Sequence, residues 1–378
     1  MLKIVADEKI PFLKGVIEPY ASIKYMAGKE IDSKAIADAN ALLIRTRTKC
    51  TGHLLKDSGV KFIGTATIGF DHIDTRYCDT NDIRWANAPG CNSSSVQQYM
   101  VAALLRISHE FRFRLKDKTL GIIGAGNVGW KVEKAASILG MNVLVNDPPR
   151  ERREGEKGFA RIEKVLTESD ILTFHVPLTV VGEDRTFHMI NEKILKKVKR
   201  GTWLINTSRG EVADSTAVKQ ALESGRLAGV VLDVWEHEPD IDHELMHRTF
   251  ISTPHIAGYS TDGKANGTAM IVNQMAHFFN LPVKEWYPEV LPEPSSPEIE
   301  INCKGLDEED ILRIAVEHSY NISEDDLKLR FAPADFEKQR GDYPLRREFP
   351  AYTLKLKNGN KKIKGMLDKL GFKLLNLK

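Results

Sequence analysis

The sequence is poor in cysteine and has no long apolar run. Its four cysteines, at positions 50, 78, 91 and 303, lie far apart, and none has the spacing of a metal-binding motif. We therefore expect neither a metal site nor a disulfide framework, and no oxidising compartment is indicated. No apolar run approaches the roughly 20 residues of a membrane span, and residues 1–7 lack the apolar core of a signal peptide. These absences predict a cytoplasmic protein.

The sequence also has little net charge. Its 54 lysines and arginines nearly balance 52 aspartates and glutamates, which leaves a net charge of +2. The basic run at residues 355–364 has no accompanying aromatic series on which bases could stack. We therefore expect neither nucleic acid nor a membrane as a partner. A length of 378 residues predicts two or three domains, and a hydrophobic content of 42% is typical of a globular protein.

A glycine motif at residues 119–147 is the clearest positive feature. A short apolar segment breaks at Gly124, and Gly126 and Gly129 complete the pattern Gly-x-Gly-x-x-Gly. A helical run follows, and a second apolar segment ends at Asp147. This order of strand, glycine turn, helix and strand is the context in which the pattern binds a dinucleotide.

The predicted cofactor is NAD. The glycines would let the backbone approach a pyrophosphate, and the free amides at the start of the helix, around Asn127 and Val128, would face its charge. Asp147 stands where a carboxylate accepts hydrogen bonds from the ribose hydroxyls and repels the 2′-phosphate of NADP. Arginines at positions 150, 152 and 153 weaken this preference, since a nearby arginine can tolerate that phosphate.

Alternating apolar and polar segments predict two parallel α/β sheets of the doubly wound class. The strands expected in the first sheet are residues 3–6, 41–44, 60–63 and 83–86, and residues 34–39 are expected to be helical. Besides the two strands of the glycine motif, those expected in the second sheet are residues 171–174, 203–205, 228–231 and 250–252. Long helices at 95–109 and 259–279 would connect the domains, and five prolines between residues 282 and 297 predict an extended linker.

Three polar residues, Arg209, Glu238 and His255, stand just beyond successive strands of the second sheet. Open α/β sheets bind ligands beyond the carboxyl ends of their strands. Histidine can take the proton of an alcohol near neutral pH. A neighbouring carboxylate would orient the imidazole, and arginine can hold a substrate carboxylate through two hydrogen bonds. Each alone could be an ordinary surface or packing residue, but together they predict hydride transfer from a 2-hydroxy acid to NAD.

Three segments resemble the signatures of the D-isomer-specific 2-hydroxyacid dehydrogenases. They are Asn-Thr-Ser-Arg-Gly at 206–210, Asp-Val-Trp-x-x-Glu-Pro at 233–239 and Thr-Pro-His-Ile-Ala-Gly at 253–258. The resemblance implies two Rossmann-like domains. It also implies that Arg209 binds the substrate carboxylate, that His255 is the acid–base and that Glu238 pairs with it.

The same resemblance implies further ligand contacts. Asp233 would reach the nicotinamide amide, and Val176 stands where a threonine near the cofactor is more usual. The other positions implied for the cofactor are Thr207, Ser208 and Gly258. Those implied for the substrate are Arg45, Thr46, Thr67 and Tyr259.

The likeness is closer to one branch of this family, which oxidises a phosphorylated four-carbon acid in vitamin B6 biosynthesis. It is carried by residues 62–67, 88–92, 146–150, 172–175 and 255–259, and by the tail segment 336–350. The resemblance implies a substrate domain at 1–93 and 259–285 and an NAD-binding domain at 94–258. It further implies a small α+β dimerisation domain at 290–378, and hence a homodimer.

Two expectations concern this tail. Its apolar residues, such as Ile311, Leu312, Ile314 and Ala315, are too few for an independent core of that length. We therefore expect them to pack against a second subunit in a two-fold dimer. The tail arginines Arg340, Arg346 and Arg347 either supply a cation to a substrate phosphate or make only surface ion pairs, and the sequence leaves both open.

Other functions share these signatures. D-3-phosphoglycerate dehydrogenase is one alternative, although it usually carries a regulatory tail that residues 340–350 do not resemble. Another D-2-hydroxyacid dehydrogenase is a second. A transcriptional corepressor that uses this fold to sense NADH is an alternative from a different class, because such a protein can retain the catalytic residues. Against it, the tail resembles that of a metabolic enzyme.

Overall fold

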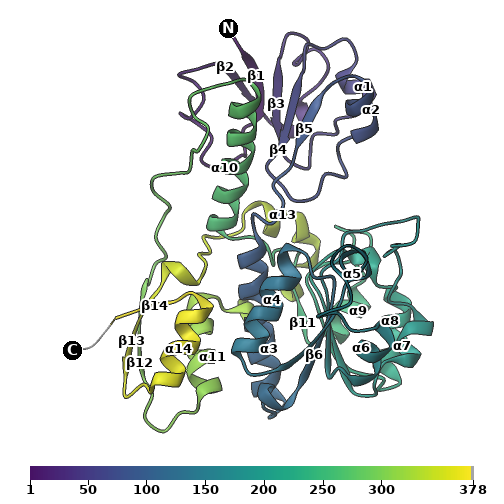
Figure 1. The fold of residues 1–378 in the computed structure, drawn as a ribbon, viewed down its shortest axis with the longest axis vertical. Coiled ribbons are helices and arrows are strands. Elements are labelled where there is room, and N and C mark those ends of the chain that lie inside the picture. The colour runs from purple at the N-terminus through teal and green to yellow at the C-terminus, as the bar shows by residue number, and fades with distance from the viewer. Residues whose placement is uncertain (376–378) are drawn as a thin grey trace. The chain divides into compact units, whose positions relative to one another are not determined.

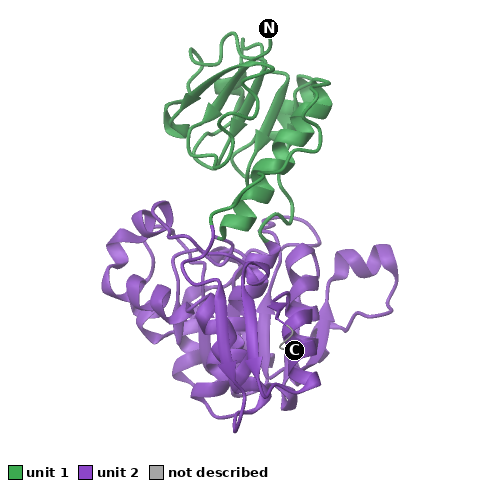
Figure 2. Cartoon of the chain, turned by 90° about the vertical axis from the view of Figure 1, so that its left-hand side faces the viewer, with its two compact units in different colours: residues 1–92, 260–292 green, residues 93–259, 293–378 purple. Residues whose placement is uncertain are grey.

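The computed structural model describes residues 1–375 and forms two compact units (Figures 1 and 2). Unit 1 comprises Met1–Asn92 and Ser260–Pro292. Unit 2 comprises Ser93–Tyr259 and Glu293–Lys378. Each unit is therefore built from two separate stretches of chain, and the C-terminal segment belongs with the central one. No helix in the described part of the chain is both long and apolar enough to cross a membrane.

Unit 1 holds a sheet of five parallel strands in the order β2-β1-β3-β4-β5. The strands are β1 (Lys3–Asp7), β2 (Ser22–Met26), β3 (Ala41–Ile44), β4 (Phe62–Thr65) and β5 (Arg84–Ala86). The central strands β3 and β4 are fully buried, which explains their continuous apolar sequences. The helices of unit 1 are η1 (Gly28–Glu30), α1 (Gly52–Leu55), α2 (Thr75–Thr80) and α10 (Thr261–Phe278).

Helix α10 closes one face of this sheet. Its side chains Ile271, Val272 and Met275 share a core with residues of β1, β3 and β4. One expectation for unit 1 is wrong, since residues 34–39 form turns rather than a helix. Strand β2 was not predicted from the sequence. Strand β2 is a partly exposed edge strand with a weak apolar signal.

The larger sheet of unit 2 has six parallel strands in the order β11-β10-β9-β8-β6-β7. They are β6 (Thr119–Ile123), β7 (Asn142–Asn146), β8 (Ile171–Phe174), β9 (Thr202–Asn206), β10 (Leu227–Leu232) and β11 (Ile251–Ser252). The order reverses beside β6, since β7 pairs with one side of it and β8 with the other. Ligands of open α/β sheets bind at such a switch point.

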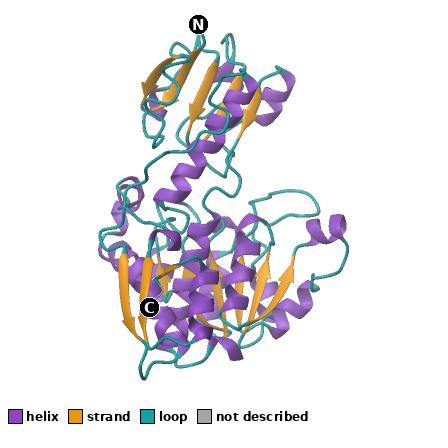
Figure 3. Cartoon of the chain, turned by 60° about the vertical axis from the view of Figure 1, so that its left-hand side comes forward, coloured by secondary structure: helices purple, strands orange, loops and turns teal. Residues whose placement is uncertain are grey.

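Helices cover both faces of this sheet (Figure 3). Alternate residues of a strand point to opposite faces, so Leu120 and Ile122 of β6 lie in one core and Ile123 in the other. The first core is shared with α3 (Ser93–Glu110) and α4 (Asn127–Ile138). The second is shared with α6 (Ile162–Glu168), α7 (Glu192–Lys197), α8 (Ser215–Glu223) and α9 (His243–Arg248). The short helices η2 (Leu115–Asp117), α5 (Pro148–Glu154) and η3 (Gly210–Val212) complete this part. The predicted doubly wound class is confirmed.

The C-terminal segment has a small parallel sheet in the order β12-β13-β14. Its strands are β12 (Glu298–Asn302), β13 (Thr353–Lys357) and β14 (Lys373–Leu374). Its longer helices are α11 (Glu308–Ser319), α12 (Ile322–Phe331), α13 (Phe336–Gly341) and α14 (Lys361–Leu370), with the short turns η4 (Pro333–Asp335) and η5 (Phe349–Ala351). In β12 the isoleucines point inward, while the glutamates outside pair with lysines of β13.

The apolar side of this segment packs within its own chain. Ile311, Leu312 and Ala315 of α11 are buried in the core that includes residues of α3, β6 and α4. The expectation that these residues bury against a second subunit is therefore wrong. Counting the apolar residues of the tail alone missed the surface of α3, against which α11 lies.

Candidate active site

The candidate residues of unit 2 gather at the carboxyl edge of the six-stranded sheet, where parallel strands end together. The glycine turn follows β6, Asp147 follows β7, and Val176 follows β8. Beyond the next three strands lie the segments Thr207 to Arg209, Asp233 to Glu238, and His255 to Gly258. Sequence reasoning thus placed these groups on one edge, as the structure does.

The glycine turn is shaped for close approach. Gly124 has a φ of +90°, and a side chain there would meet the carbonyl oxygen of His175 on the neighbouring strand end. Gly126 has no atom within 4 Å of the position that a Cβ would occupy, so the backbone there faces open space. Helix α4 begins at Asn127 and presents its free amides to that space. The turn fits a pyrophosphate group.

Asp147 is held rigidly beside this turn. Its Oδ2 accepts from the amide of Ala125 at 2.7 Å, and its Oδ1 accepts from the amide of Arg150 at 2.9 Å, which caps α5. The guanidinium of Arg150 forms a fork with Glu154, with distances of 2.9 and 2.7 Å. Arg150 is therefore already paired with Glu154, which weakens its attraction for a 2′-phosphate and favours NAD.

His175, which the sequence analysis did not include among the site residues, lies beside a predicted cofactor residue. Its Nδ1 is 3.4 Å from the hydroxyl of Thr207, and its Nε2 is 3.1 Å from that of Thr173. Burial lowers the pKa of His175 to about 3, so the imidazole is neutral at physiological pH. Its position in the segment 172–175 was the available signal.

His255 and Glu238 form the predicted pair. The Nδ1 of His255 lies 2.7 Å from Oε2 of Glu238, while Oε1 of Glu238 accepts from the amide of Trp235 at 3.0 Å. Burial alone would raise the pKa of Glu238, but the hydrogen bond and charge of His255, the Trp235 amide and Arg340 together lower it. An ionised Glu238 can orient the imidazole and stabilise its protonated form.

Asp233 fixes the loop that carries His255. Its Oδ1 accepts from the hydroxyl of Thr253 and the amide of Ile256, both at 2.7 Å, and its Oδ2 accepts from the amide of Ala257 at 2.9 Å. Through these bonds the backbone of His255 is held at a φ of +56°, a conformation that non-glycine residues rarely adopt. Burial raises the pKa of Asp233. The contact of Asp233 with nicotinamide stays a prediction.

Arg209 and Ser208 lie at the end of β9. The Nη1 of Arg209 donates to the carbonyl of Ser208 at 2.7 Å, and among the described residues no carboxylate pairs with this guanidinium. Gly210 follows, and a side chain there would collide with the backbone of Trp235, so glycine allows the loops after β9 and β10 to lie against each other. Arg209 therefore has donors left for an anionic ligand.

The three tail arginines have different surroundings. Arg346 is only 5% exposed, and its guanidinium donates to Oε1 of Gln98 and to the carbonyls of Ser95 and Ile256. Both expectations for Arg346, a phosphate ligand or a surface ion pair, are therefore wrong. The carbonyl of Arg347 accepts from Gln98 at 3.0 Å. Arg340 reaches the edge of the site, where its Nη2 donates to the hydroxyl of Tyr259 at 3.3 Å.

The other predicted substrate residues belong to unit 1. Arg45 and Thr46 follow β3, and the Nη1 of Arg45 donates to the carbonyl of Lys9 at 3.4 Å. Thr67 follows β4, and its hydroxyl lies 2.7 Å from that of Thr65.

The hydroxyl of Thr65 also lies 2.9 Å from Nε2 of His72, a residue not singled out from the sequence. Burial lowers the pKa of His72, although the charge of Asp71 opposes the shift. A neutral imidazole thus supports the pair of threonines at the end of β4 and in the loop after it.

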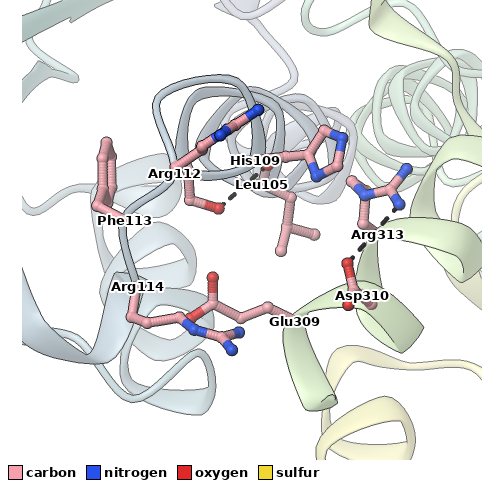
Figure 4. A pocket seen from close by; sticks show the side chains of 9 residues that line it. Leu105, His109, Arg112, Phe113, Arg114, Glu309, Asp310 and Arg313 are labelled. Atoms are coloured by element: carbon pink, nitrogen blue, oxygen red, sulfur yellow. Dashed lines mark hydrogen bonds and ion pairs between the residues drawn. The ribbon is translucent and has the colours of Figure 1, made fainter. Parts of the chain in front are cut away.

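A cavity of about 310 Å³ lies elsewhere in unit 2 (Figure 4). It is lined by the end of α3, the turn that leads into β6, and the start of α11. Its arginines are largely paired: Arg114 with Asp307 at 2.7 Å and Arg313 with Glu317 at 2.9 Å. Because it adjoins the beginning of β6, this cavity lies at the edge opposite the candidate site and is not part of it.

Comparison with known proteins identifies the family. Residues 94–257 match the NAD-binding domain of the D-isomer-specific 2-hydroxyacid dehydrogenases, and residues 290–371 match a domain of unknown function. The chain is 48% identical over 355 residues to the erythronate-4-phosphate dehydrogenase of Bacteroides thetaiotaomicron, which covers 93% of this chain and 99% of that protein. The chain belongs to the erythronate-4-phosphate dehydrogenase family.

Further relatives support this family assignment. The erythronate-4-phosphate dehydrogenase of Hahella chejuensis is 39% identical over 381 residues, with 99% of both chains covered. Among solved structures, the D-lactate dehydrogenase of Aquifex aeolicus in complex with NAD and lactic acid superposes with a TM-score of 0.61 at 26% identity. It covers 77% of this chain and 100% of that one. The predicted NAD cofactor and the class of NAD-dependent dehydrogenase are confirmed.

Proposed function

We propose that this dehydrogenase oxidises 4-phospho-D-erythronate at C2 to 2-oxo-3-hydroxy-4-phosphobutanoate in vitamin B6 biosynthesis. The observation that carries the proposal is the His255–Glu238 pair, with its 2.7 Å hydrogen bond, on the same strand edge as the glycine turn. Its support from outside the structure is the near full-length similarity to erythronate-4-phosphate dehydrogenases.

The proposed roles follow from the geometry. NAD, when bound, accepts the hydride from C2. His255 takes the proton of the C2 hydroxyl, and ionised Glu238 stabilises the resulting imidazolium. Arg209, which has no carboxylate partner among the described residues, holds the substrate carboxylate through its planar fork.

We propose that cations of unit 1 contribute to recognition of the substrate phosphate. Arg45, Thr46 and Thr67 are the residues inferred from the family resemblance, together with Tyr259 of unit 2. Lys264, in the first turn of α10, adds a charge: burial first, and the charge of Arg45 second, lower the pKa of this lysine. A neighbouring cation destabilises the protonated form of a lysine, and a bound phosphate would stabilise that form.

The proposal is tested by offering the purified protein NAD with a panel of phosphorylated four- and three-carbon 2-hydroxy acids. NADH formation and mass spectrometry of the product should single out 4-phospho-D-erythronate. The control His255→Asn should lose about 10²- to 10⁴-fold in kcat while binding NAD as tightly as the wild type. A clear preference for 3-phosphoglycerate would replace this proposal with D-3-phosphoglycerate dehydrogenase, and inactivity toward every acid would favour the corepressor-type sensor.

We further propose a homodimer formed through the C-terminal segment. Helix α12 leaves two large apolar side chains uncovered within the chain: Leu327 is 51% exposed and Phe331 is 86% exposed. Four residues apart, they lie on one face of the helix. A second copy of the same helix would bury them by two-fold pairing, the commonest arrangement in homo-oligomers.

We also infer that the protein works in the cytoplasm. All four cysteines are free and buried, which fits a reducing compartment.

A further inference from the structure

The C-terminal segment reaches the carboxyl edge of the large sheet. Along β11, Asp326 of α12 accepts from the amide of Ser252 at 2.6 Å, and Arg330 donates to the carbonyls of Met246 and Thr249. Helix α13 follows, anchored by Phe336, which is fully buried in the core on the α6–α9 side of the sheet. These contacts hold α13 beside the loop that carries Glu238.

Arg340 of α13 lies next to the catalytic pair. Its Nη1 is 4.0 Å from Oε2 of Glu238, the same oxygen that bonds to Nδ1 of His255. The same Nη1 is 3.2 Å from Glu337, and Nη2 donates to the hydroxyl of Tyr259 at 3.3 Å. The guanidinium also lies 5.9 Å from the ring centre of Tyr259. The guanidinium of Arg340 is therefore held by Glu337 and Tyr259, and its positive charge faces Glu238.

We propose that Arg340 is a positioning residue of the proposed dehydrogenase reaction: it shares Oε2 of Glu238 with His255 and so sets how strongly Glu238 holds the imidazolium. The inference rests on the proposed function. It makes the C-terminal segment part of the active site in the same subunit. Arg340 itself need not touch the reacting atoms.

The charges around the pair fix the direction of the effect. Asp233 bonds to the amides of Ile256 and Ala257 next to His255, and Arg346 binds the Ile256 carbonyl from the tail. Glu337 partly neutralises Arg340. Among these groups, Arg340 alone adds a positive charge at the oxygen that binds the imidazole. It therefore disfavours a proton on His255, and its removal favours one.

The first test is the pH dependence of kcat/KM for acid oxidation, in which His255 must be neutral to accept a proton. Arg340→Gln should move the acid limb to higher pH by about half a unit to one unit, since the site is partly exposed. Arg340→Lys keeps the charge and should restore most of the wild-type profile. Arg313→Gln is the matched control, because Arg313 is a tail arginine of similar exposure, 21% against 22%, and is also ion-paired. It should leave the profile unchanged.

The second test does not depend on the substrate. NMR of protein labelled with ¹³C in histidine, with the His255 signal assigned by its loss in His255→Asn, should show the same displacement of the His255 titration midpoint. Glu337→Gln, which frees Arg340 for Glu238, should move it to lower pH. Thermal melts establish that the variants are folded.

Defined outcomes overturn the inference. A folded Arg340→Gln protein that titrates like the wild type contradicts it, as does a raised KM with an unchanged profile, which would make Arg340 a substrate ligand. If Arg340→Gln does not fold, an unmoved midpoint in Glu337→Gln overturns it. If the wild type oxidises no acid of the panel, the proposed function fails, while the NMR titration still decides the role of Arg340.

Discussion

At the scale of residues, two carboxylates support His255 from different surroundings. Asp233 is fully buried among neutral donors, and burial raises its pKa. Glu238 faces His255 and Arg340, and these outweigh burial and lower its pKa. Asp233 therefore suits a structural task in holding the loop, whereas Glu238 suits electrostatic support of a proton on His255.

Glu238→Gln should shift the acid limb of kcat/KM to lower pH and reduce kcat, because the imidazolium loses its ionised partner.

Folding lowers the pKa of Glu238. Its contribution to stability is thus present above its unfolded pKa, about 4.3, and is lost as the pH falls through the folded value. The melting temperature of Glu238→Gln should accordingly fall less steeply than that of the wild type as the pH drops below about 4.3. Asp240→Asn, at an exposed neighbouring position, is the control. An unmoved acid limb in Glu238→Gln would contradict the pairing.

Asp147→Asn removes the charge of this residue while it keeps the helix cap to Arg150. Asparagine can still accept from the amide of Arg150 and so keep the helix cap, but its amide nitrogen cannot accept from Ala125. The melting temperature should therefore fall, but by less than in Asp147→Ala. The preference for NAD over NADP should narrow, because the repulsion of a 2′-phosphate is removed. Asp147→Ala should narrow it too, but also lower the unfolding free energy by about 1 kcal/mol through loss of the cap. The measurement is kcat/KM with each cofactor, and equal efficiencies already in the wild type would refute the preference.

The sequence located residues that follow strands but not those that meet across the chain. Arg209, Glu238 and His255 could be placed because parallel strands end at one edge. Arg340 could not be assigned to Glu238, since their contact depends on how the tail packs along β11. Arg346 was misplaced for the same reason: its basic side chain gave no sign that Gln98 and two carbonyls would surround it.

At the scale of elements, the strand–turn–helix–strand unit of β6, α4 and β7 matches its prediction closely. Its apolar periodicity and glycines are local signals, and so were available in the sequence. The sequence did not indicate which element packs against α11, because its partner α3 lies far away along the chain. Local patterns predict an element, but the surface that buries it depends on the whole fold.

Arg346 joins the tail to the loop that carries His255, because its guanidinium donates to the carbonyl of Ile256. Arg346→Ala should lower the unfolding free energy by about 3 kcal/mol, because it removes three hydrogen bonds of a buried cation. The stacking of its guanidinium at 3.7 Å from the ring centre of Tyr320 is lost as well. Denaturant unfolding is the measurement. Arg347→Ala, at a more exposed neighbour, should lower the stability less. Equal losses of unfolding free energy in the two variants would refute the idea that Arg346 fixes the tail to the loop of His255.

At the scale of the whole molecule, the tail is both a support for unit 2 and the proposed contact between subunits. These two roles involve different surfaces. Ile311 and Leu312 of α11 face the core, whereas Leu327 and Phe331 of α12 remain exposed. Deleting the tail would therefore unfold unit 2 rather than yield a folded monomer. Point substitutions on α12 test the subunit contact without this loss of structure.

The combined change Leu327→Ser and Phe331→Ser should weaken the proposed dimer, since it removes the apolar surface available for pairing. Light scattering over a range of concentrations should show a dimeric wild type and a variant shifted toward monomer with an unchanged melting temperature at low concentration. Val181→Ser, at a 79% exposed valine in the loop after β8, is the control. A monomeric wild type, or an unaffected dimer in the double variant, would refute this interface.

The discontinuity of unit 1 has a consequence for biosynthesis. Domains generally fold as units, the N-terminal one first, while the ribosome is still elongating the chain. Residues 1–92 cannot follow that order, because the apolar face of β3 and β4 is covered by Ile271, Val272 and Met275 of α10, which are made only after the first stretch of unit 2, residues 93–259. The nascent chain must therefore carry an uncovered sheet while residues 93–259 are translated. The domain that emerges first from the ribosome is thus completed only after the first stretch of unit 2 has been made.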